Sequence, residues 1–257
     1  MTIARAFASI LILCAAASAL AQPVSAPAAA ADPDATCVIA LATVIGRGQA
    51  AGGSPLNPEH REYITNAVHF YSGRLTARYP ADALAGAMIA ANRAFPQGRA
   101  PATAADCIRQ FGAAMTRTGT EGQRAFEALG IREGQEPAPL PATAVDALHP
   151  DMRCFAMLAN ITATLSPRRQ ELSPEVAAGF PLLENGMAFY LGLALDALPG
   201  DAFGAAFATA LRARRPEARD GAAQLANCLE RVDRDMGRMA QASRRAGEDE
   251  AGAGERR

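Results

Sequence analysis

Apolar residues recur along this chain at intervals of three and four positions, which is the spacing of one face of an α-helix. The longest such stripe follows Ser173 and consists of Val176, Phe180, Leu183, Met187, Tyr190, Ala194 and Leu198. Alternating runs of β-branched residues, which would mark half-buried strands, do not occur in the sequence. The pattern therefore predicts an all-α protein built from helical bundles.

Two long helices are expected to begin at capping sequences. Asn57-Pro58-Glu59 and Ser173-Pro174-Glu175 each place a capping side chain before a proline and an acid. Proline suits the first helical position, and the acid complements the positive end of the helix dipole. Pro80 should end the long helix that begins after Asn57, and Pro181 should kink or split the long helix that begins after Ser173.

Shorter helices complete the pattern. We expect a first helix near Cys37 that stops at Gly46 and Gly48, and a later one capped by Asp82. Thr103-Ala104-Ala105-Asp106 resembles a capping box before a fourth helix. Four helices thus precede the Pro/Gly-rich stretch at 130–145.

The same plan returns in the second half of the chain. His69–Phe95 reappears in degenerate form at Ala188–Arg214, with an offset of 119 residues. The matches other than alanine are Phe70 with Phe189, Tyr71 with Tyr190, Gly73 with Gly192, Pro80 with Pro199, Asp82 with Asp201 and Arg93 with Arg212. We interpret this as an internal duplication of a four-helix unit, forming either two bundles or one pseudo-two-fold bundle. The repeats are expected at 35–129 and 146–240, joined by a linker at 130–145.

The N-terminus has the features of an export signal. Arg5 precedes the apolar run AFASILILCAAASAL and the small-x-small sequence Ala19-Leu20-Ala21. The run is too short for a membrane anchor, so residues 1–21 should be cleaved near Ala21/Gln22, leaving no stable membrane span in the mature chain. We expect a periplasmic or secreted protein, with a disordered Pro/Ala-rich tether at 22–34 and a disordered tail at 241–257.

Charge and composition narrow the possible partners. The formal net charge is −1 and the chain contains no lysine. A nearly balanced exported protein is a poor candidate for nucleic-acid binding. Abundant Ala, Gly, Pro and Arg indicate a GC-rich bacterial source. Arginines cluster at Arg168/Arg169, Arg212/Arg214/Arg215 and Arg244/Arg245 and could bind an anion or acidic lipid, but solvated helix ends are the preferred interpretation.

Four cysteines of the mature chain give the strongest chemical signal. Each repeat holds two, at matching places: Cys37 and Cys107, then Cys154 and Cys228. In an exported protein this pattern predicts disulfides, although three pairings are open and all obey the repeat symmetry. We favour Cys37 with Cys107 and Cys154 with Cys228, because each bond ties the first helix of a unit to its fourth. The alternative is buried reduced thiols.

Candidate reaction chemistry is sparse. His69 and Ser72 lie three positions apart on one helix and are the only nominated catalytic pair, with Glu62 or Asp82 as a third member. The duplicated positions are Ala188 and Leu191, so the repeat does not carry this pair. His60 and His69 are nine apart and point to opposite sides of a helix, and no histidine is close in sequence to any cysteine. We expect neither a metal nor a cofactor.

The aromatic pairs at the centre of each repeat have two interpretations. Phe70, Tyr71, Phe189 and Tyr190 could line an apolar ligand pocket between helices, but core packing beside a helical glycine is favoured. The leading hypothesis is a non-enzymatic exported bacterial protein that binds an unknown protein partner in the cell envelope or has a structural role there. A carrier of a small apolar ligand is second, and an enzyme using His69 and Ser72 is third.

Overall fold

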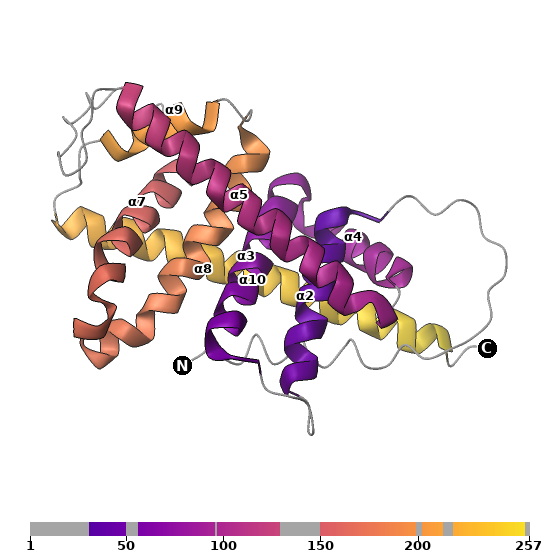
Figure 1. The fold of residues 1–257 in the computed structure, drawn as a ribbon. Coiled ribbons are helices and arrows are strands. Elements are labelled where there is room, and N and C mark those ends of the chain that lie inside the picture. Colours follow the sequence, from indigo (N-terminus) through magenta and orange to yellow (C-terminus); the bar gives the residue numbers. More distant parts are fainter. Residues whose placement is uncertain are drawn as a thin grey trace. The chain divides into compact units, whose positions relative to one another are not determined.

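The computed structural model describes residues 31–49, 56–95, 97–128, 150–198, 202–212 and 218–254, and nearly all of these residues are helical (Figure 1). In chain order the helices are α2 (Pro33–Gln49), α3 (Pro58–Arg78), α4 (Ala81–Ala94), the 3₁₀ helix η2 (Gln97–Arg99), α5 (Ala100–Ala128), α7 (Pro150–Leu165), the 3₁₀ helix η3 (Ser166–Glu171), α8 (Pro174–Ala197), α9 (Ala202–Arg212) and α10 (Ala218–Gly254). No strand occurs among the described residues. The all-α prediction is confirmed.

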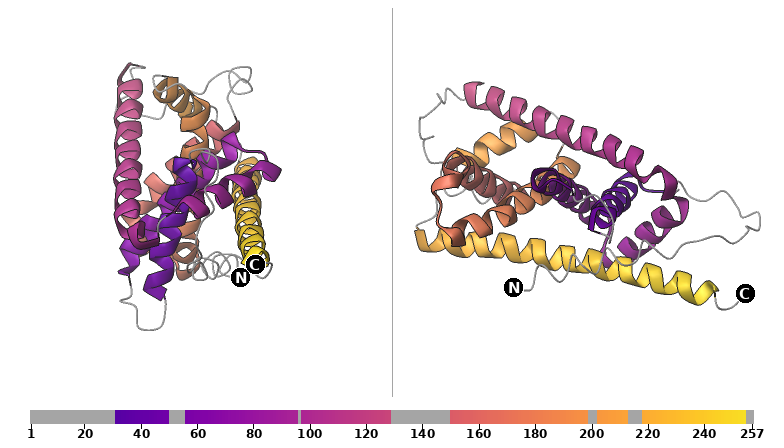
Figure 2. Two further views of the ribbon diagram at one scale, coloured as in Figure 1. Left: turned by 90° about the vertical axis from the view of Figure 1, so that its right-hand side faces the viewer. Right: turned by 60° about the horizontal axis from the view of Figure 1, so that its bottom comes forward.

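The chain divides into two compact units. Unit 1 comprises residues 1–108 and 233–257, and unit 2 comprises residues 109–232. These limits fall inside α5 and α10 rather than at the expected repeat boundaries. A helix of 29 residues is about 43 Å long and one of 37 residues about 55 Å, at about 1.5 Å per residue. Figure 2 shows each as one uninterrupted helix.

Unit 1 is organised around α2, which packs against α3 and α4. Residues Ala35 and 37–43 of α2 are all buried, so neighbours surround this helix rather than covering one face. A helix that is apolar on every side is typical of the centre of a core. The second half of α3 is buried in the same way, from Ala67 to Gly73.

Unit 2 repeats this arrangement with other helices. Here α7 packs against α8 and α9, and α8 is buried on all sides from Ala188 to Ala194. An aromatic cluster joins α7 to α9, with the ring centroids of Phe155 and Phe207 5.1 Å apart. The ring of Phe207 also lies against Gly122 of α5, where a Cβ would come within 3.1 Å of it. This glycine lets the two helices approach closely.

The caps of the two long helices agree with the predictions. The Asn57 side chain accepts a hydrogen bond from the amide of Glu59 at 2.9 Å, and the Ser173 side chain accepts one from Val176 at 3.4 Å. Helix α8 continues through Pro181 as a single helix, so the expected split does not occur.

Several expected boundaries are different in the structure. Helix α2 continues past Gly46 and Gly48 to Gln49, and α5 begins at Ala100, before the capping box proposed at residues 103–106. Asp82 lies in the first turn of α4 and does not cap it; Pro80 occupies the cap position. Glycine lowers helix stability without forbidding a helix, and burial of α2 offsets that cost.

The two segments expected to be disordered are partly helical. Asp32 and Asp34, assigned to the tether at 22–34, cap and begin α2, and α10 extends through the tail at 241–257 as far as Gly254. Alanine, glutamate and arginine are frequent in that tail and favour helix even without an apolar stripe. The segment 1–21, expected to be a signal peptide, lies outside the described residues, as does the expected linker at 130–145.

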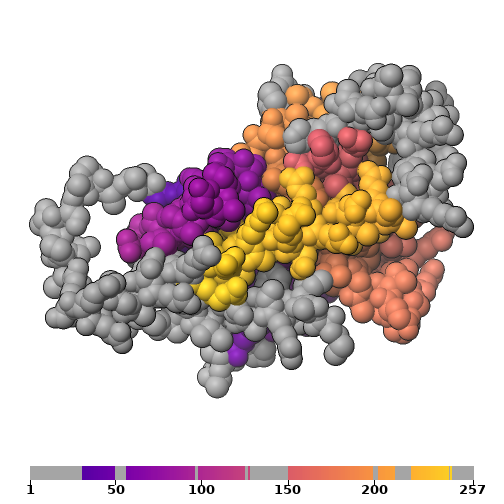
Figure 3. Space-filling view, turned by 180° about the vertical axis from the view of Figure 1, so that it is seen from behind, coloured from indigo at the N-terminus to yellow at the C-terminus, as the bar shows by residue number. Residues whose placement is uncertain are grey.

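Amphipathic periodicity is clearest in α10. Cys228, Val232, Met236 and Met239 are buried as expected, while Arg234 and Arg238 are among the exposed residues between them. Figure 3 shows the solvent face of this helix in yellow.

Candidate functional site

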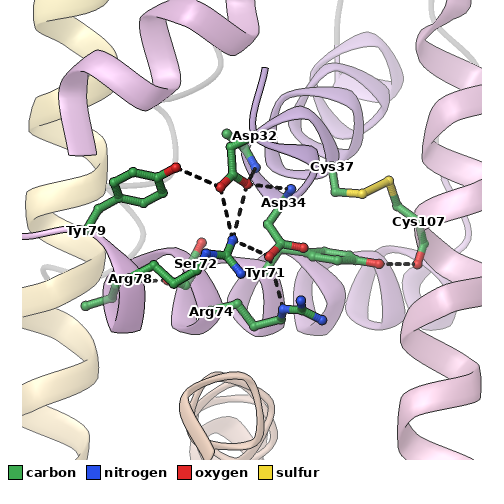
Figure 4. Close-up of polar contacts among 11 residues, drawn as sticks. Asp32, Asp34, Cys37, Tyr71, Ser72, Arg74, Arg78, Tyr79 and Cys107 are labelled. Carbon is green, nitrogen blue, oxygen red and sulfur yellow. Dashed lines mark hydrogen bonds and ion pairs between the residues drawn. A yellow bond between two sulfur atoms is a disulfide. The ribbon is translucent and has the colours of Figure 1, made fainter. Parts of the chain in front are cut away.

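The tyrosines of the two aromatic pairs make equivalent contacts. Tyr71 on α3 and Tyr190 on α8 are 1% and 0% exposed. The Tyr71 hydroxyl donates to the backbone carbonyl of Cys107 at 2.8 Å (Figure 4), and the Tyr190 hydroxyl donates to that of Cys228 at 3.0 Å. Each acceptor belongs to a disulfide cysteine, so the tyrosine and the disulfide fix the same turn of α5 or α10.

Both favoured disulfides are formed. Cys37 is bonded to Cys107 with the Cα atoms 5.6 Å apart, and Cys154 is bonded to Cys228 with the Cα atoms 5.8 Å apart. The first bond ties α2 to α5, and the second ties α7 to α10. On the chain-entropy model, closing a loop of this size stabilises the native state by about 4 kcal/mol. The matching contacts in both units accord with a duplication, which itself stays a prediction.

The phenylalanines complete each aromatic pair. Phe70 and Tyr71 meet edge to face at 5.1 Å, and Phe189 and Tyr190 do so at 5.6 Å. All four residues are buried in the core of their unit. Burial, followed by the nearby Asp34 carboxylate, raises the pKa of Tyr71 to about 12, so the hydroxyl remains a donor at neutral pH. A ligand pocket at these residues stays a prediction.

A polar cluster that sequence analysis did not identify lies at the start of α2. Asp32 is the N-cap: its Oδ1 accepts the amide of Asp34 at 2.8 Å and that of Ala35 at 3.2 Å. Its other oxygen accepts a hydrogen bond at 2.9 Å from the hydroxyl of Tyr79, and this bond is the main cause of a raised Tyr79 pKa. The cap therefore ties the first turn of α2 to the end of α3 (Figure 4).

Two arginines of α3 neutralise the acids in this cluster. Arg78 reaches both oxygens of Asp32 at 3.2 Å and also contacts Asp34. Arg74 Nε lies 3.0 Å from Asp34 Oδ2, and its guanidinium is 5.8 Å from the ring centre of Phe70. The Asp34 side chain is only 6% exposed. A carboxylate at this depth needs such a partner, because burial removes most of its hydration.

Unit 2 has a corresponding acid–arginine pair, in which the arginine comes from α10. Asp151, like Asp34, is buried and lies three residues before the first cysteine of its unit. It pairs with Arg231 of α10, whose guanidinium is 5.8 Å from the ring centre of Tyr190. The ion pair, the disulfide and the tyrosine hydrogen bond thus all connect α10 to the rest of unit 2 within four residues, 228–231.

The nominated catalytic pair lies inside the core. His69 is 4% exposed, and its Nδ1 donates to the carbonyl of Thr65 at 2.9 Å, since a carbonyl can only accept. Burial lowers the His69 pKa to about 4, so the ring is neutral at pH 7. Ser72 is fully buried, and its Oγ has no hydrogen-bond partner in the structure. Histidine and serine are therefore not joined as base and nucleophile.

The structure does not bring the other candidate residues together into a site among the residues that it describes. Within the described ranges, no three His, Cys, Asp or Glu side chains are grouped as a metal site would require. His60 is exposed at the start of α3, as expected. Arg169 stacks on Phe180, with its guanidinium 4.7 Å from the ring centre, and its Nη1 is 3.9 Å from Glu184 Oε1, so this arginine contributes to packing. Arg168 and Arg244 are exposed. The side chains of Arg212, Arg214, Arg215 and Arg245 lie outside the described residues.

A local sequence signal could have identified the α2 cluster. Asp32-Pro33-Asp34 has the cap, proline and acid order already recognised in Asn57-Pro58-Glu59. The Pro/Ala-rich context favoured a tether instead. Nothing local indicates that Arg74 and Arg78 of α3 bind these acids, or that Arg231 binds Asp151, because the pairs are separated by at least 40 residues.

Comparisons of the chain with models of protein families, with curated proteins and with solved structures give no significant match. In the part of the chain that the structure describes, no helix combines the length and apolar character needed to cross a membrane.

Proposed function

We propose that this chain is an exported bacterial protein that acts without catalysis, by binding a protein partner in the cell envelope. The observation that carries the proposal is that the tyrosines and the histidine considered for a ligand pocket or for catalysis, and the cysteines, make hydrogen bonds and disulfides within the core. The tyrosine hydroxyls donate to cysteine carbonyls, His69 donates to a helix carbonyl, and all four mature cysteines are in disulfides. These groups stabilise a scaffold.

Export is supported by two independent features. The first 21 residues have the charge, apolar run and small-residue pattern of a signal peptide. Both disulfides fit an oxidising compartment such as the periplasm, since cytosolic reductants keep most thiols reduced. Cleavage near Ala21/Gln22 is part of the proposal.

The first half of α8 in unit 2 carries two exposed large apolar side chains, on sides of the helix about 120° apart. Val176 and Leu182, both in the first half of this helix, are 45% and 36% exposed, whereas residues 188–194 are buried. Exposed large apolar side chains on one helix segment contribute well to protein contacts when a partner covers them. We place the contact at this segment.

The test uses the full chain in a bacterial host. Ala178 is exposed on the same segment, so a photo-crosslinking amino acid at this position should give one discrete envelope adduct. The double variant V176D/L182D, with the crosslinker kept at position 178, should lose that adduct because charge replaces both exposed apolar side chains.

The matched control is A113D on the exposed face of α5, which should keep the adduct. Both variants should keep the helical circular-dichroism signal and the melting temperature of the unaltered chain, which shows that the chain is folded. An adduct that survives the double variant, or no adduct with the unaltered segment, would refute the proposed contact.

A further inference from the structure

The two disulfides differ in their access to solvent. In unit 1 both partners are buried, with Cys37 5% and Cys107 2% exposed. In unit 2 Cys228 is 2% exposed, but Cys154 is only half-buried. Thiol–disulfide exchange begins with attack of a thiolate on one sulfur, so a bond reacts in the folded state only where a reagent can reach that sulfur. Of the four disulfide cysteines, Cys154 is the one that is not fully buried.

The residue before each outer cysteine adds a difference in charge. Arg153 precedes Cys154 and is itself half-buried, whereas the uncharged Thr36 precedes Cys37. A positive charge at the adjacent position in the sequence attracts an incoming thiolate toward Cys154 through space, an effect that salt weakens. Access and charge therefore favour the same sulfur.

Unit 2 also has contacts that do not depend on its disulfide. The Asp151–Arg231 ion pair joins α7 to α10 one turn from the cysteines, and Tyr190 of α8 donates to the Cys228 carbonyl, which cysteine reduction leaves unchanged. The helices joined by the disulfide thus remain connected after it opens. These contacts favour a dithiol form that stays folded.

We propose that Cys154 is an exchange site at which a dithiol reductant opens the Cys154–Cys228 bond in the folded protein, while Cys37–Cys107 is a permanent staple. This inference is independent of the proposed function. A thiolate of the reductant attacks Cys154 Sγ, the S–S bond breaks, and Cys228 leaves as a thiolate that takes up a proton. The second thiol of the reductant then displaces Cys154 and closes its own disulfide. Two electrons and two protons pass from the dithiol to the protein.

The experiment is timed reduction of the oxidised protein with dithiothreitol, first without urea and then at a low urea concentration. Free thiols are trapped by alkylation, and each cysteine is quantified by peptide mass spectrometry. We expect Cys154 and Cys228 to become alkylated at least about tenfold faster than Cys37 and Cys107, because exchange follows access to the sulfur. Low urea should leave the fast rate unchanged and accelerate the slow one, which requires unfolding.

Two variants test the local cause. R153T should slow opening of the unit 2 bond about threefold at low salt, the effect of one nearby charge. T36R, its matched counterpart, should leave the unit 1 bond slow because the sulfurs there are buried. Equal rates for the two disulfides, faster opening of Cys37–Cys107, or an equal urea dependence of both would overturn the proposal.

Discussion

Removing one hydroxyl from the core distinguishes packing from ligand binding at the aromatic pairs. Tyr71→Phe keeps the buried ring and its edge-to-face contact with Phe70, but removes the 2.8 Å bond to the Cys107 carbonyl. A carbonyl inside a helix already accepts from the amide four residues later, so this loss does not leave it unsatisfied. The expected cost is therefore the net value of one neutral hydrogen bond, about 1 kcal/mol. Tyr190→Phe should cost a similar amount, since its bond is 3.0 Å long.

The assay is urea and thermal unfolding of the oxidised protein, followed by circular dichroism. A loss of about 1 kcal/mol lowers the melting temperature by about 2–4 °C for a protein of this size. Tyr63→Phe is the control, because Tyr63 is 41% exposed and water can replace any contact that its hydroxyl makes. It should change stability less than either core variant. Unchanged stability in both core variants would refute the structural role of the hydroxyls, and loss of a copurifying small molecule would then support the carrier hypothesis.

Three further predictions concern His69, two glycines and Ser72. Stability should fall as the pH drops from about 6.5 to about 4, because burial lowers the His69 pKa to about 4 in the folded chain from its ordinary value of 6.5. The unfolded state therefore binds the proton first, and the loss of stability approaches about 3 kcal/mol below pH 4. In urea titrations at a series of pH values, H69Q should flatten this pH dependence. Gly204→Ala should destabilise unit 2 by about 1–3 kcal/mol, because its Cβ would lie 2.7 Å from the Glu121 carbonyl oxygen. Gly237→Ala should instead stabilise the protein by about 0.5–1 kcal/mol, because a Cβ there meets nothing within 4 Å. Equal melting temperatures for the two variants would contradict this prediction. Ser72→Ala should raise the free energy of unfolding by about 1 kcal/mol, since it removes a buried hydroxyl that has no partner; a less stable variant would show that the hydroxyl is bonded.

Much of the fold could be predicted from short sequence patterns. The caps at Asn57 and Ser173 were predictable because a capping side chain bonds amides only two or three residues away. The disulfide pairing was also favoured in advance, from the rule that each bond should tie the first helix of a unit to its fourth. The caps depend on short-range geometry, and the disulfide pairing depends on the order of the helices.

Long-range features were not predictable in the same way. The apolar stripe of α10 fixes which residues are buried, including Val232 and Met236, but not that residues up to 232 belong to unit 2 and later ones to unit 1. The periodicity of a helix is identical whichever neighbour covers it. For the same reason, the sequence nominated Tyr71 as a core or pocket residue without indicating that its hydroxyl reaches Cys107.

The position of each tyrosine gives a reason why the two units converge on the same contact. A disulfide removes conformations mainly from the unfolded chain, but it leaves each joined helix able to rotate and slide about the bond. A hydrogen bond from a fully buried tyrosine to the carbonyl of the same cysteine fixes the rotation of that helix, because only one face then presents the carbonyl to the ring. In unit 1 the hydroxyl of Tyr71 fixes α5 at Cys107, and in unit 2 that of Tyr190 fixes α10 at Cys228. Staple and hydrogen bond thus act on different degrees of freedom of one helix turn, so loss of either alone should weaken the unit without unfolding it.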